Sequence, residues 1–473
     1  MSQHIDFLLL GLGNGAVYAA LAVAIVVVYR SSGVLNFATG AMALQSAQTY
    51  VFLRQGSLLV LIPFLPNTLD VGGGWGDWTA LEVTMLLEAA FALLLYFVVF
   101  RPLRRRSGLA KAVASVGVMI VLSGLVAQRA VDGPTLAAAF FPSGRIEFAG
   151  SFATTDRLYL ALTVIALALL LGGIDRFTAF GLRTRAASQS EVGALVSGLS
   201  PTRIGAANWA LSGAIIALAG VLISPLTPLA SGTYTLFVVP ALAAAVIGRF
   251  TKMVPAVAAG LAIGMLQSEV VYLQSRYEWM PDNGAGELVP LALVLVFLVA
   301  RSPKLPGRGA LRSSFPDSTR APRSVAVPAV LLTAAGLAAI FVLDGSYRSA
   351  LYTTFIMAMF GLSLVVITGY LGQISLAQLS IGGVAGFLMA TLTTDWGLPF
   401  PVAPLLAALC ATAVGVVIGL PAMRVRGMFM AVVTLMLAVA LEAVWFRNPQ
   451  FAGGADGNQV EPPTLFGLDL GIG

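Results

Sequence analysis

Residues that could carry catalytic chemistry are scarce in this chain of 473 residues. It has one histidine, His4, and one cysteine, Cys410, so it cannot assemble the usual ligand sets of zinc or haem sites. The sequence contains no G-x-x-x-x-G-K-[ST] phosphate-binding loop, no H-E-x-x-H and no G-x-S-x-G. We therefore predict no catalytic residues, no metal site, no cofactor and no enzymatic activity of its own, ATP hydrolysis included.

Polar side chains instead lie singly inside long apolar runs. Glu88 is in the middle of LEVTMLLEAAFALLLY, where a proton relay or a structural hydrogen bond to a neighbouring helix would explain it. Cys410 is expected to be a small buried apolar side chain. Because a polar side chain that faces lipid is costly, the others are expected to face partner helices or a wet cavity. These are Asn14, Asn36, Gln45, Gln48, Gln128, Asn208, Gln267, Gln373 and Gln378.

The composition indicates that lipid surrounds these runs. The chain is 58% hydrophobic and 10% charged, whereas soluble chains carry about 25% charged residues. A helix needs about 20 apolar residues to cross a bilayer. Such runs lie at 7–29, 34–53, 80–100, 110–130, 158–174, 205–226, 254–274, 324–343, 350–368, 371–393, 401–420 and 428–446. Two shorter runs, 235–248 and 288–300, fit tilted, broken or re-entrant segments. We predict an all-α, polytopic transmembrane bundle of about 14 spans.

The distribution of charge predicts the topology. Most of the 27 Lys and Arg residues lie in alternate gaps if fourteen segments cross. Positive loops stay in the cytoplasm, so the N-terminus is expected in the periplasm and no nucleic-acid partner is needed to explain the net charge of +6. The gap 301–323 is rich in proline and basic residues and reads as a cytoplasmic linker, with a membrane-surface or nucleic-acid patch as the alternative. The basic gaps are Arg30, 101–111, 175–203, 249–252, 301–323 and 421–427.

An internal repeat relates the two parts of the chain. GVLNFAT at 33–39 and GQISLAQ at 372–378 share one pattern, and PLRRRSGL at 102–109 resembles PAMRVRGM at 421–428. The matched segments run in the same direction, which predicts two parallel pseudo-repeats around a central pathway. Glycines allow bent helices there, and polar side chains need a wet or paired environment. We predict that the pathway is lined by Asn14, Asn36, Thr39, Ser375 and Gln378.

The gap 175–203 predicts a structured surface element. AASQSEVGALVSG at 186–198 has apolar residues at helical spacing but is too polar to span, which indicates a short amphipathic helix. Gly198 suits the end of that helix, while Ser200 and Pro201 suit the start of the next one. Docking on another protein, or resting on lipid, would cover its apolar face.

These motifs resemble the two permease subunits of bacterial ABC importers for branched-chain (hydrophobic) amino acids. LNFATGAMAL, RPLRRRSGLAKAVASVG, ALVSGLSPTRI and AVIGRFTKMVPAVAAGLAIG resemble one permease type; TGYLGQISLAQLSIGGVAGF, PAMRVRGMFMAVVTLMLA and AGGADGN resemble its partner. The two types are normally separate polypeptides. The resemblance implies a fusion, with a first half at 1–300 (about nine spans), the linker 301–323 and a second half at 324–473 (about five spans, incomplete).

The resemblance also implies partners and a role. An importer of this kind moves a small amino acid across the bacterial inner membrane by alternating access, using two cytoplasmic ABC ATPase subunits and an extracytoplasmic solute-binding protein, within membrane lipid. Matched residue by residue, the coupling loop against the ATPase carries over to Ala187, Glu191, Ala194, Gly198, Leu199 and Arg203.

Two departures qualify the resemblance. Thr39 stands where the family commonly has His, which leaves a substrate contact there in doubt, and no second coupling loop precedes Gly473, so we expect a truncated chain. The main alternative is a secondary transporter or channel for a small neutral solute that needs no ATPase. A membrane-embedded enzyme and a non-transporting scaffold are further rivals.

Overall fold

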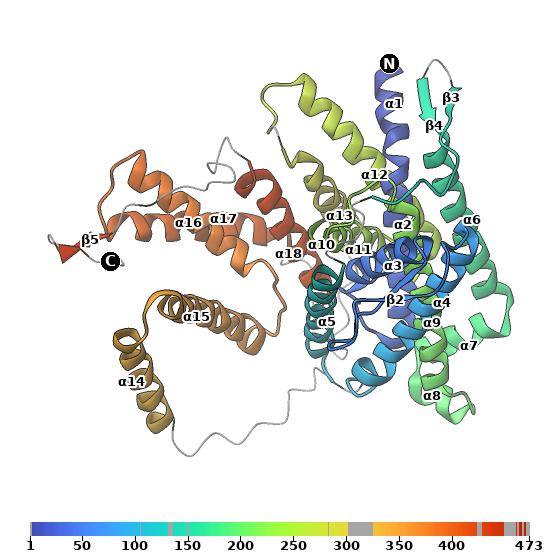
Figure 1. Ribbon diagram of the computed structural model, residues 1–473. Helices are drawn as coiled ribbons and strands as arrows, with labels where there is room; N and C mark the ends of the chain where they lie inside the picture. Colours follow the sequence, from blue (N-terminus) through green and yellow to red (C-terminus); the bar gives the residue numbers. More distant parts are fainter. Residues whose placement is uncertain are drawn as a thin grey trace.

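Helices dominate the computed structural model, which describes residues 2–104, 106–130, 136–148, 151–281, 283–300, 325–422, 428–448, 460, 463–465 and 468–469 (Figure 1). Within them, eight helices are long and apolar enough to cross a membrane. Shorter apolar helices occupy five more of the predicted spans, and α3 (Thr39–Arg54) occupies the remaining one. The prediction of an all-α, polytopic bundle is confirmed.

The first part of the chain contributes the larger helical body. Its helices are α1 (Ser2–Leu10), α2 (Leu12–Ser32), α3, α4 (Asp77–Leu95), the π-helix η1 (Tyr96–Phe100), α5 (Gly108–Arg129), α6 (Thr155–Phe177), α7 (Ala179–Gln189), α8 (Glu191–Val196), α9 (Pro201–Ile223), α10 (Ser231–Leu236), α11 (Val238–Ile247), α12 (Met253–Arg276), η2 (Ala285–Glu287) and α13 (Leu288–Ala300). Two antiparallel hairpins join β1 (Ser57–Leu59) to β2 (Thr68–Asp70) and β3 (Arg145–Phe148) to β4 (Ser151–Thr154).

The second part is smaller. It comprises α14 (Ala326–Val342), α15 (Gly345–Val365), η3 (Val366–Tyr370), α16 (Gln378–Thr394), α17 (Val402–Ala422), α18 (Met428–Leu441), η4 (Glu442–Phe446) and the antiparallel pair β5 (Thr464–Leu465) and β6 (Leu468–Asp469). Three segments lie outside the described residues: the predicted linker 301–323, residues 423–427 of the basic gap 421–427, and the AGGADGN segment.

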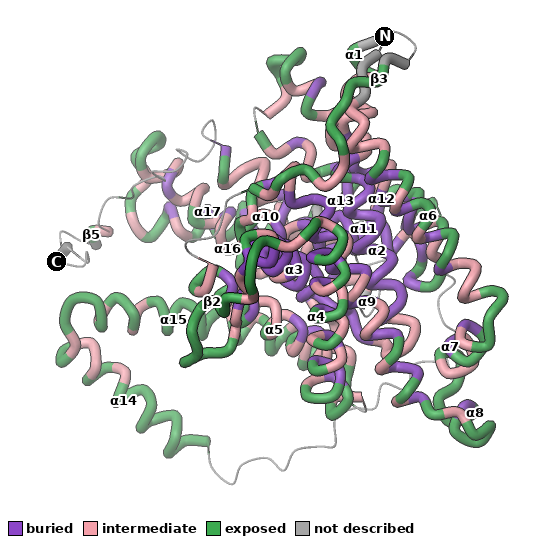
Figure 2. Tube along the Cα trace, turned by 45° about the vertical axis from the view of Figure 1, so that its right-hand side comes forward, coloured by how far each residue is buried: buried purple, intermediate pink, exposed green. Residues whose placement is uncertain are grey.

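The core is built around α2 and α3. Apolar residues surround α2 on every side, which is the pattern of a helix enclosed by other helices. It packs against α6, α9, α11 and α12, while α3 packs against α4, α5, α9 and α10. Almost every residue of both helices is buried, and the buried residues gather at their centre in Figure 2. α3 is thereby shielded from lipid, which explains why a helix with several Gln, Ser and Thr residues is tolerated here.

The two short runs form helices that are too short for an upright crossing. The segment Ser231–Ile247 is divided at Phe237 into α10 and α11, and the second short helix is Ala285–Ala300. At about 1.5 Å per residue both fall short of the roughly 30 Å hydrocarbon core. Residues 238–246 of α11 are all buried, so this helix is part of the protein interior rather than a lipid-facing span.

One hydrogen-bonding device occurs in both repeats. Gly33 (φ 62°) and Gly372 (φ 63°) adopt the left-handed conformation before the connection to α3 and α16, respectively. In the first connection the backbone N–H of Phe37 donates to Ser115 Oγ on α5 at 3.3 Å. In the second, the N–H of Leu376 donates to Thr434 Oγ1 on α18 at 3.0 Å. These positions match in the sequence repeat, which confirms that the halves share one local architecture.

Among the described residues, the second part contacts the first mainly through α18 and η4. α18 packs against α11 and α13, whereas α14 contacts α15 and α15 contacts α16. None of the residues of α14 or α15 is buried, and Figure 1 shows both helices apart from the main body. Cys410 on α17 is exposed, so the expectation that it is buried was wrong: the apolar run has an outward face, and Cys410 lies on it.

Glycines allow α2 and α12 to lie very close together. A Cβ atom at Gly264 would be 2.2 Å from Gly15 N, and one at Gly11 would be 2.4 Å from Gly264 O. Gly260 faces Ala19 in the same way. Small residues four apart on both helices thus let the two backbones touch, as in other membrane helix pairs. Gly11 and Gly15 of the GLGNG segment at 11–15 are thus sites of close helix packing.

We expect Gly264→Leu to destabilise the fold, because the new side chain would overlap the backbone of α2. Overpacking of this kind typically costs about 1–3 kcal/mol. The thermal unfolding midpoint of the detergent-purified chain should fall clearly. The control is Gly173→Leu on α6, since no heavy atom lies within 4 Å of a Cβ there. Equal midpoints for the two variants would contradict this packing.

Candidate functional site

Four of the predicted basic gaps meet at one end of the molecule, which we call the basic end. They contribute Arg30, residues of the 101–111 and 175–203 gaps, and Lys252 to a single cavity of about 750 Å³. Figure 1 shows α7 and α8 at this end and α1 with the β3–β4 hairpin at the other. The four basic gaps that the charge distribution predicted on the same side of the membrane therefore lie at the same end of the first half.

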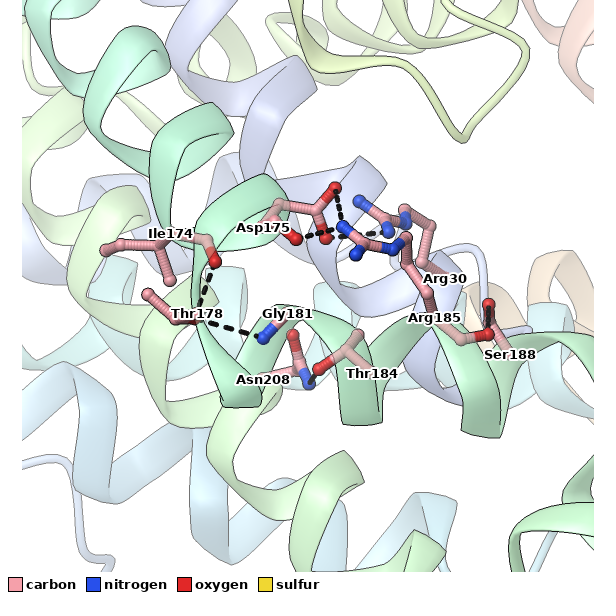
Figure 3. A network of polar contacts seen from close by, with 9 residues as sticks. All are labelled: Arg30, Ile174, Asp175, Thr178, Gly181, Thr184, Arg185, Ser188 and Asn208. Carbon is pink, nitrogen blue, oxygen red and sulfur yellow. Dashed lines mark hydrogen bonds and ion pairs between the residues drawn. The ribbon is translucent and has the colours of Figure 1, made fainter.

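Asp175, at the end of α6, joins the basic end to the core (Figure 3). Its Oδ1 accepts a hydrogen bond from Arg30 Nη2 at 2.9 Å, and its Oδ2 lies 3.6 Å from Arg185 Nη1. The Arg185 side chain also donates to the Asp175 backbone carbonyl. One carboxylate thus holds the end of α2 and the middle of α7 together, and the Arg30 side chain is only 8% exposed.

A second set of contacts fixes α7 against α9. Asn208 Nδ2 donates to Thr184 Oγ1 at 3.3 Å and to the Ile204 carbonyl at 2.8 Å, and all three residues are buried. Gly181 approaches the Asp175 backbone so closely that a Cβ would lie 2.2 Å from its carbonyl oxygen. The α7 segment is therefore clamped to the transmembrane helices rather than loosely attached.

The structure divides the predicted amphipathic helix into two. α7 ends at Gln189 and α8 begins at Glu191, because Ser190 adopts an extended conformation and its hydroxyl caps α8 by accepting from Gly193 N at 3.0 Å. The predicted boundaries beyond it are present. Gly198 has φ 75°, and Ser200 caps α9 with Pro201 in its first turn.

The six proposed coupling residues lie on or beside α8 at the basic end. Glu191 is exposed and pairs with Arg104, which follows η1; Arg104 also donates to Thr202 Oγ1 at 3.3 Å. Gly198 and Arg203 are also exposed, Ala187 and Leu199 are half-buried, and Ala194 is buried. On the outer face of α8 the apolar side chains Val192 and Val196 are 71% and 85% exposed.

The five predicted pathway residues do not come together. Asn14 is an exposed residue near the start of α2, whereas Asn36 follows the other end of that helix. Asn36 Oδ1 accepts from Ala38 N at 3.1 Å, and Thr39 Oγ1 donates to the Asn36 carbonyl at 2.6 Å. Both are buried and shape the connection to α3.

The second repeat uses the same arrangement. Ser375 Oγ accepts from Ala377 N at 3.4 Å. Gln378 is half-buried, and both polar atoms of its side-chain amide are buried without a hydrogen-bond partner. Local hydrogen bonding accounts for Asn36, Thr39 and Ser375, and none of the five lies in the groove described next.

A groove of about 690 Å³ lies between α3, α4 and α5, under the β1 hairpin. Its lining is apolar except for a few side chains that include Gln45, Ser46, Thr84 and Glu88. The sequence identified Glu88 and Gln45 as unusual polar residues but could not show that two helices bring them together. Ser46 lies within hydrogen-bonding reach of one Glu88 carboxyl oxygen, and the other oxygen has no partner.

The fold defines a polytopic membrane protein built from apolar helices. A family model described as "Branched-chain amino acid transport system / permease component" matches residues 7–299 and again 346–469. The chain belongs to this family, and the double match is consistent with a fusion of two permease subunits. Among the described residues no cluster of three or more His, Cys, Asp or Glu side chains could hold a metal ion.

The chain is similar to individual relatives of two kinds, LivM and LivH. The chain is 33% identical over 118 residues to the high-affinity branched-chain amino acid transport system permease protein LivM of Escherichia coli, which covers 25% of this chain and 28% of LivM. It is 24% identical over 315 residues to LivH of the same organism, covering 63% of this chain and 94% of LivH. A probable LivH of Methanocaldococcus jannaschii is 24% identical over 287 residues, covering 59% and 85%. No solved structure matches the chain.

We expect Asp175→Asn to loosen α7, because two guanidinium groups lose their anionic partner. Since Asp175 is 25% exposed, the loss is about 1–2 kcal/mol of local stability. Backbone amide exchange in α7 should accelerate about ten-fold in hydrogen–deuterium exchange. Asp344→Asn is the control, because it removes an exposed Asp344–Arg348 pair elsewhere. Unchanged protection of α7 in Asp175→Asn would show that Asp175 does not hold this helix.

Proposed function

We propose that this chain is the membrane-spanning permease of an ATP-driven importer, and that it moves branched-chain or related hydrophobic amino acids by alternating access. The basic end faces the cytoplasm, as expected for basic loops, and the N-terminus faces the periplasm. Residues 1–300 and 324–473 act as two permease halves that the 301–323 segment joins. The names of the relatives, which specify branched-chain amino acid transport, support the substrate class.

The α7–α8 unit is the observation that carries this proposal. α7 is clamped to α2, α6 and α9, whereas α8 presents exposed apolar side chains next to the ion pair of Arg104 and Glu191. Because α7 is held firmly and α8 exposes apolar side chains, this unit is suited to bind another protein and to transmit its movement to the membrane helices. The proposed partners are two cytoplasmic ATPase subunits, one of which docks on α8, and a periplasmic solute-binding protein.

The contacts of α8 indicate how its movement reaches the membrane. Glu191 forms an ion pair with Arg104, which lies shortly after η1, the continuation of α4. Arg104 also donates a hydrogen bond to Thr202 at the start of α9. α4 and α9 pack along each other, and α9 contacts α2 and α3 in the core. A push on α8 by the closing ATPases would therefore move α4 and α9 together relative to the second half.

We expect Val196→Asp to weaken ATPase docking, because it places a charge in the centre of the apolar contact. An affinity-tagged chain solubilised from its native membranes should retain several-fold less ATPase than the unaltered chain. The matched control is Trp279→Asp, which changes an exposed apolar residue between α12 and η2, away from the basic end. Equal retention by both variants would remove α8 from the docking surface.

Charge reversal tests the route from α8 to the membrane. Glu191→Arg and Arg104→Glu should each lower ATP-driven uptake several-fold in proteoliposomes that contain the ATPases and the binding protein. The double reversal should restore most of it. Thermal stability should barely change, because Glu191 is 51% exposed and such pairs add about 0–1 kcal/mol. Full uptake in the single variants would exclude this route, and uptake without ATPases would favour an ion-driven carrier.

A further inference from the structure

The groove between α3, α4 and α5 runs from the hairpin end of the molecule to the middle of the membrane-spanning region. Leu58, Leu59 and the following residues 61–63 form its hairpin end. Glu88 lies in its wall, near the centre of the span Asp77–Phe100. In the proposed topology the hairpin end faces the periplasm, so the groove reaches from the side of substrate delivery to mid-membrane depth.

Glu88 has no cationic partner in the groove. It is 2% exposed, and its Oε1 atom makes no hydrogen bond. The groove-lining residues, all of them described, include no lysine, arginine or histidine. An ionised carboxylate inside a membrane is costly unless a positive group pairs with it. The groove residues do not supply that group, so Glu88 stays ionised only where a cationic ligand pairs with it and is otherwise protonated.

The polar side chains around Glu88 include several hydrogen-bond acceptors. Ser46 Oγ lies within hydrogen-bonding distance of the Met42 carbonyl and of Glu88, and Thr84 donates its hydroxyl hydrogen to the Ala80 carbonyl; each hydroxyl oxygen also has lone pairs that can accept. The Oε1 atom of Gln45 is buried and has no partner. Together with Glu88 these oxygens match the donors of an ammonium group, which has three N–H bonds and no acceptor.

The remainder of the lining is suited to a branched aliphatic chain. Leu87, Leu94 and Val118 line the groove on α4 and α5, and half of the other sixteen lining residues are Leu, Ile or Val. A cavity of about 690 Å³ is within the range of small-molecule sites, which combine apolar walls with a few polar groups. A bare metal cation would leave these walls without a partner.

The internal repeat shows that the fold does not require the polar cluster. Aligning Gly33 with Gly372, and Pro102 with Pro421, gives the corresponding positions of the second half. There Gln45, Ser46, Thr84 and Glu88 correspond to Val384, Ala385, Ala403 and Ala407. The same helices form in both halves, with apolar residues at all four positions in the second. The polar cluster therefore belongs to a function of the first half.

We propose that this groove binds an organic ammonium ion with a branched aliphatic side chain, with Glu88 receiving the ammonium group and α4 and α5 enclosing the side chain. This assignment rests on the proposed function for its physiological ligand, an amino acid in transit. Glu88 is a binding residue in this account, and Gln45, Ser46 and Thr84 orient the ammonium group.

Binding to the full chain tests the proposal. The chain is reconstituted in phosphatidylglycerol nanodiscs, which carry no lipid amine, and radiolabelled L-leucine is the probe. The competitors are 3-methylbutylamine, which is leucine without its carboxylate, and 4-methylpentanoate, which is leucine without its amine. The amine should compete with leucine at least ten-fold better than the acid. Equal competition by the two, or displacement by sodium chloride at matched ionic strength, would overturn the proposal.

Two variants and a control assign the effect to Glu88. Glu88→Gln keeps the size of the side chain and should weaken leucine binding at least ten-fold. Val121→Trp should block the groove without touching the carboxylate, so it keeps the test informative if Glu88→Gln folds poorly. Glu82→Gln, an exposed position on the same helix, should bind normally. Normal binding by both Glu88→Gln and Val121→Trp would overturn the proposal.

The outcome is separable from that of the proposed function. Full ATP-driven uptake by Glu88→Gln would refute the groove as a substrate site and leave the importer intact. Conversely, amine-selective binding that depends on Glu88, together with uptake that needs no ATPase, would refute the importer and leave the groove site standing.

Discussion

Every backbone polar group inside a bilayer must find its partner within the protein, and this constraint governs the structure described here. The connection after α2 shows it most clearly, because a turn led by Gly33 interrupts helical hydrogen bonding at the base of α3. Ser115 of α5 satisfies both sides of the break: its hydroxyl accepts from Phe37 N and lies 3.0 Å from the Leu35 carbonyl. Thr434 does the same for the N–H of Leu376 in the second half. Each repeat therefore needs its own helix to complete the turn.

The same constraint separates charge from the membrane interior. Basic residues lie at the helix ends, and at the basic end Asp175 and Glu191 bring α6, α7 and α8 into contact with Arg30, Arg104 and Arg185. Ion pairs therefore hold the surface element formed by α7 and α8 in place. Its attachment to the transmembrane helices is thus a consequence of how the chain keeps its arginines paired.

The sequence predicts the secondary-structure elements well and the tertiary contacts between them poorly. Hydropathy located the apolar helices, and local capping rules placed Gly198, Ser200 and Pro201 correctly because each acts within a few residues. The break at Ser190 was missed, since a serine that caps a helix and one that continues it look alike in a helical pattern. Polarity alone put Asn36 and Thr39 in the pathway, although their hydrogen bonds are local. The placement of Gln45 and Glu88 in one groove depends on helix packing, which periodicity does not encode.

Comparing the halves separates what the fold requires from what it carries. The left-handed glycine, the short turn and the hydroxyl on a distant helix occur in both, so they are conditions for building the helices. The acidic groove occurs in the first half and is replaced by valine and alanine in the second. Two halves that share a backbone but differ in polarity cannot be interchangeable walls of one pathway. The groove lies wholly within the first half, between α3, α4 and α5, so its polar contacts belong to that half alone, while the second half builds the corresponding helices without them.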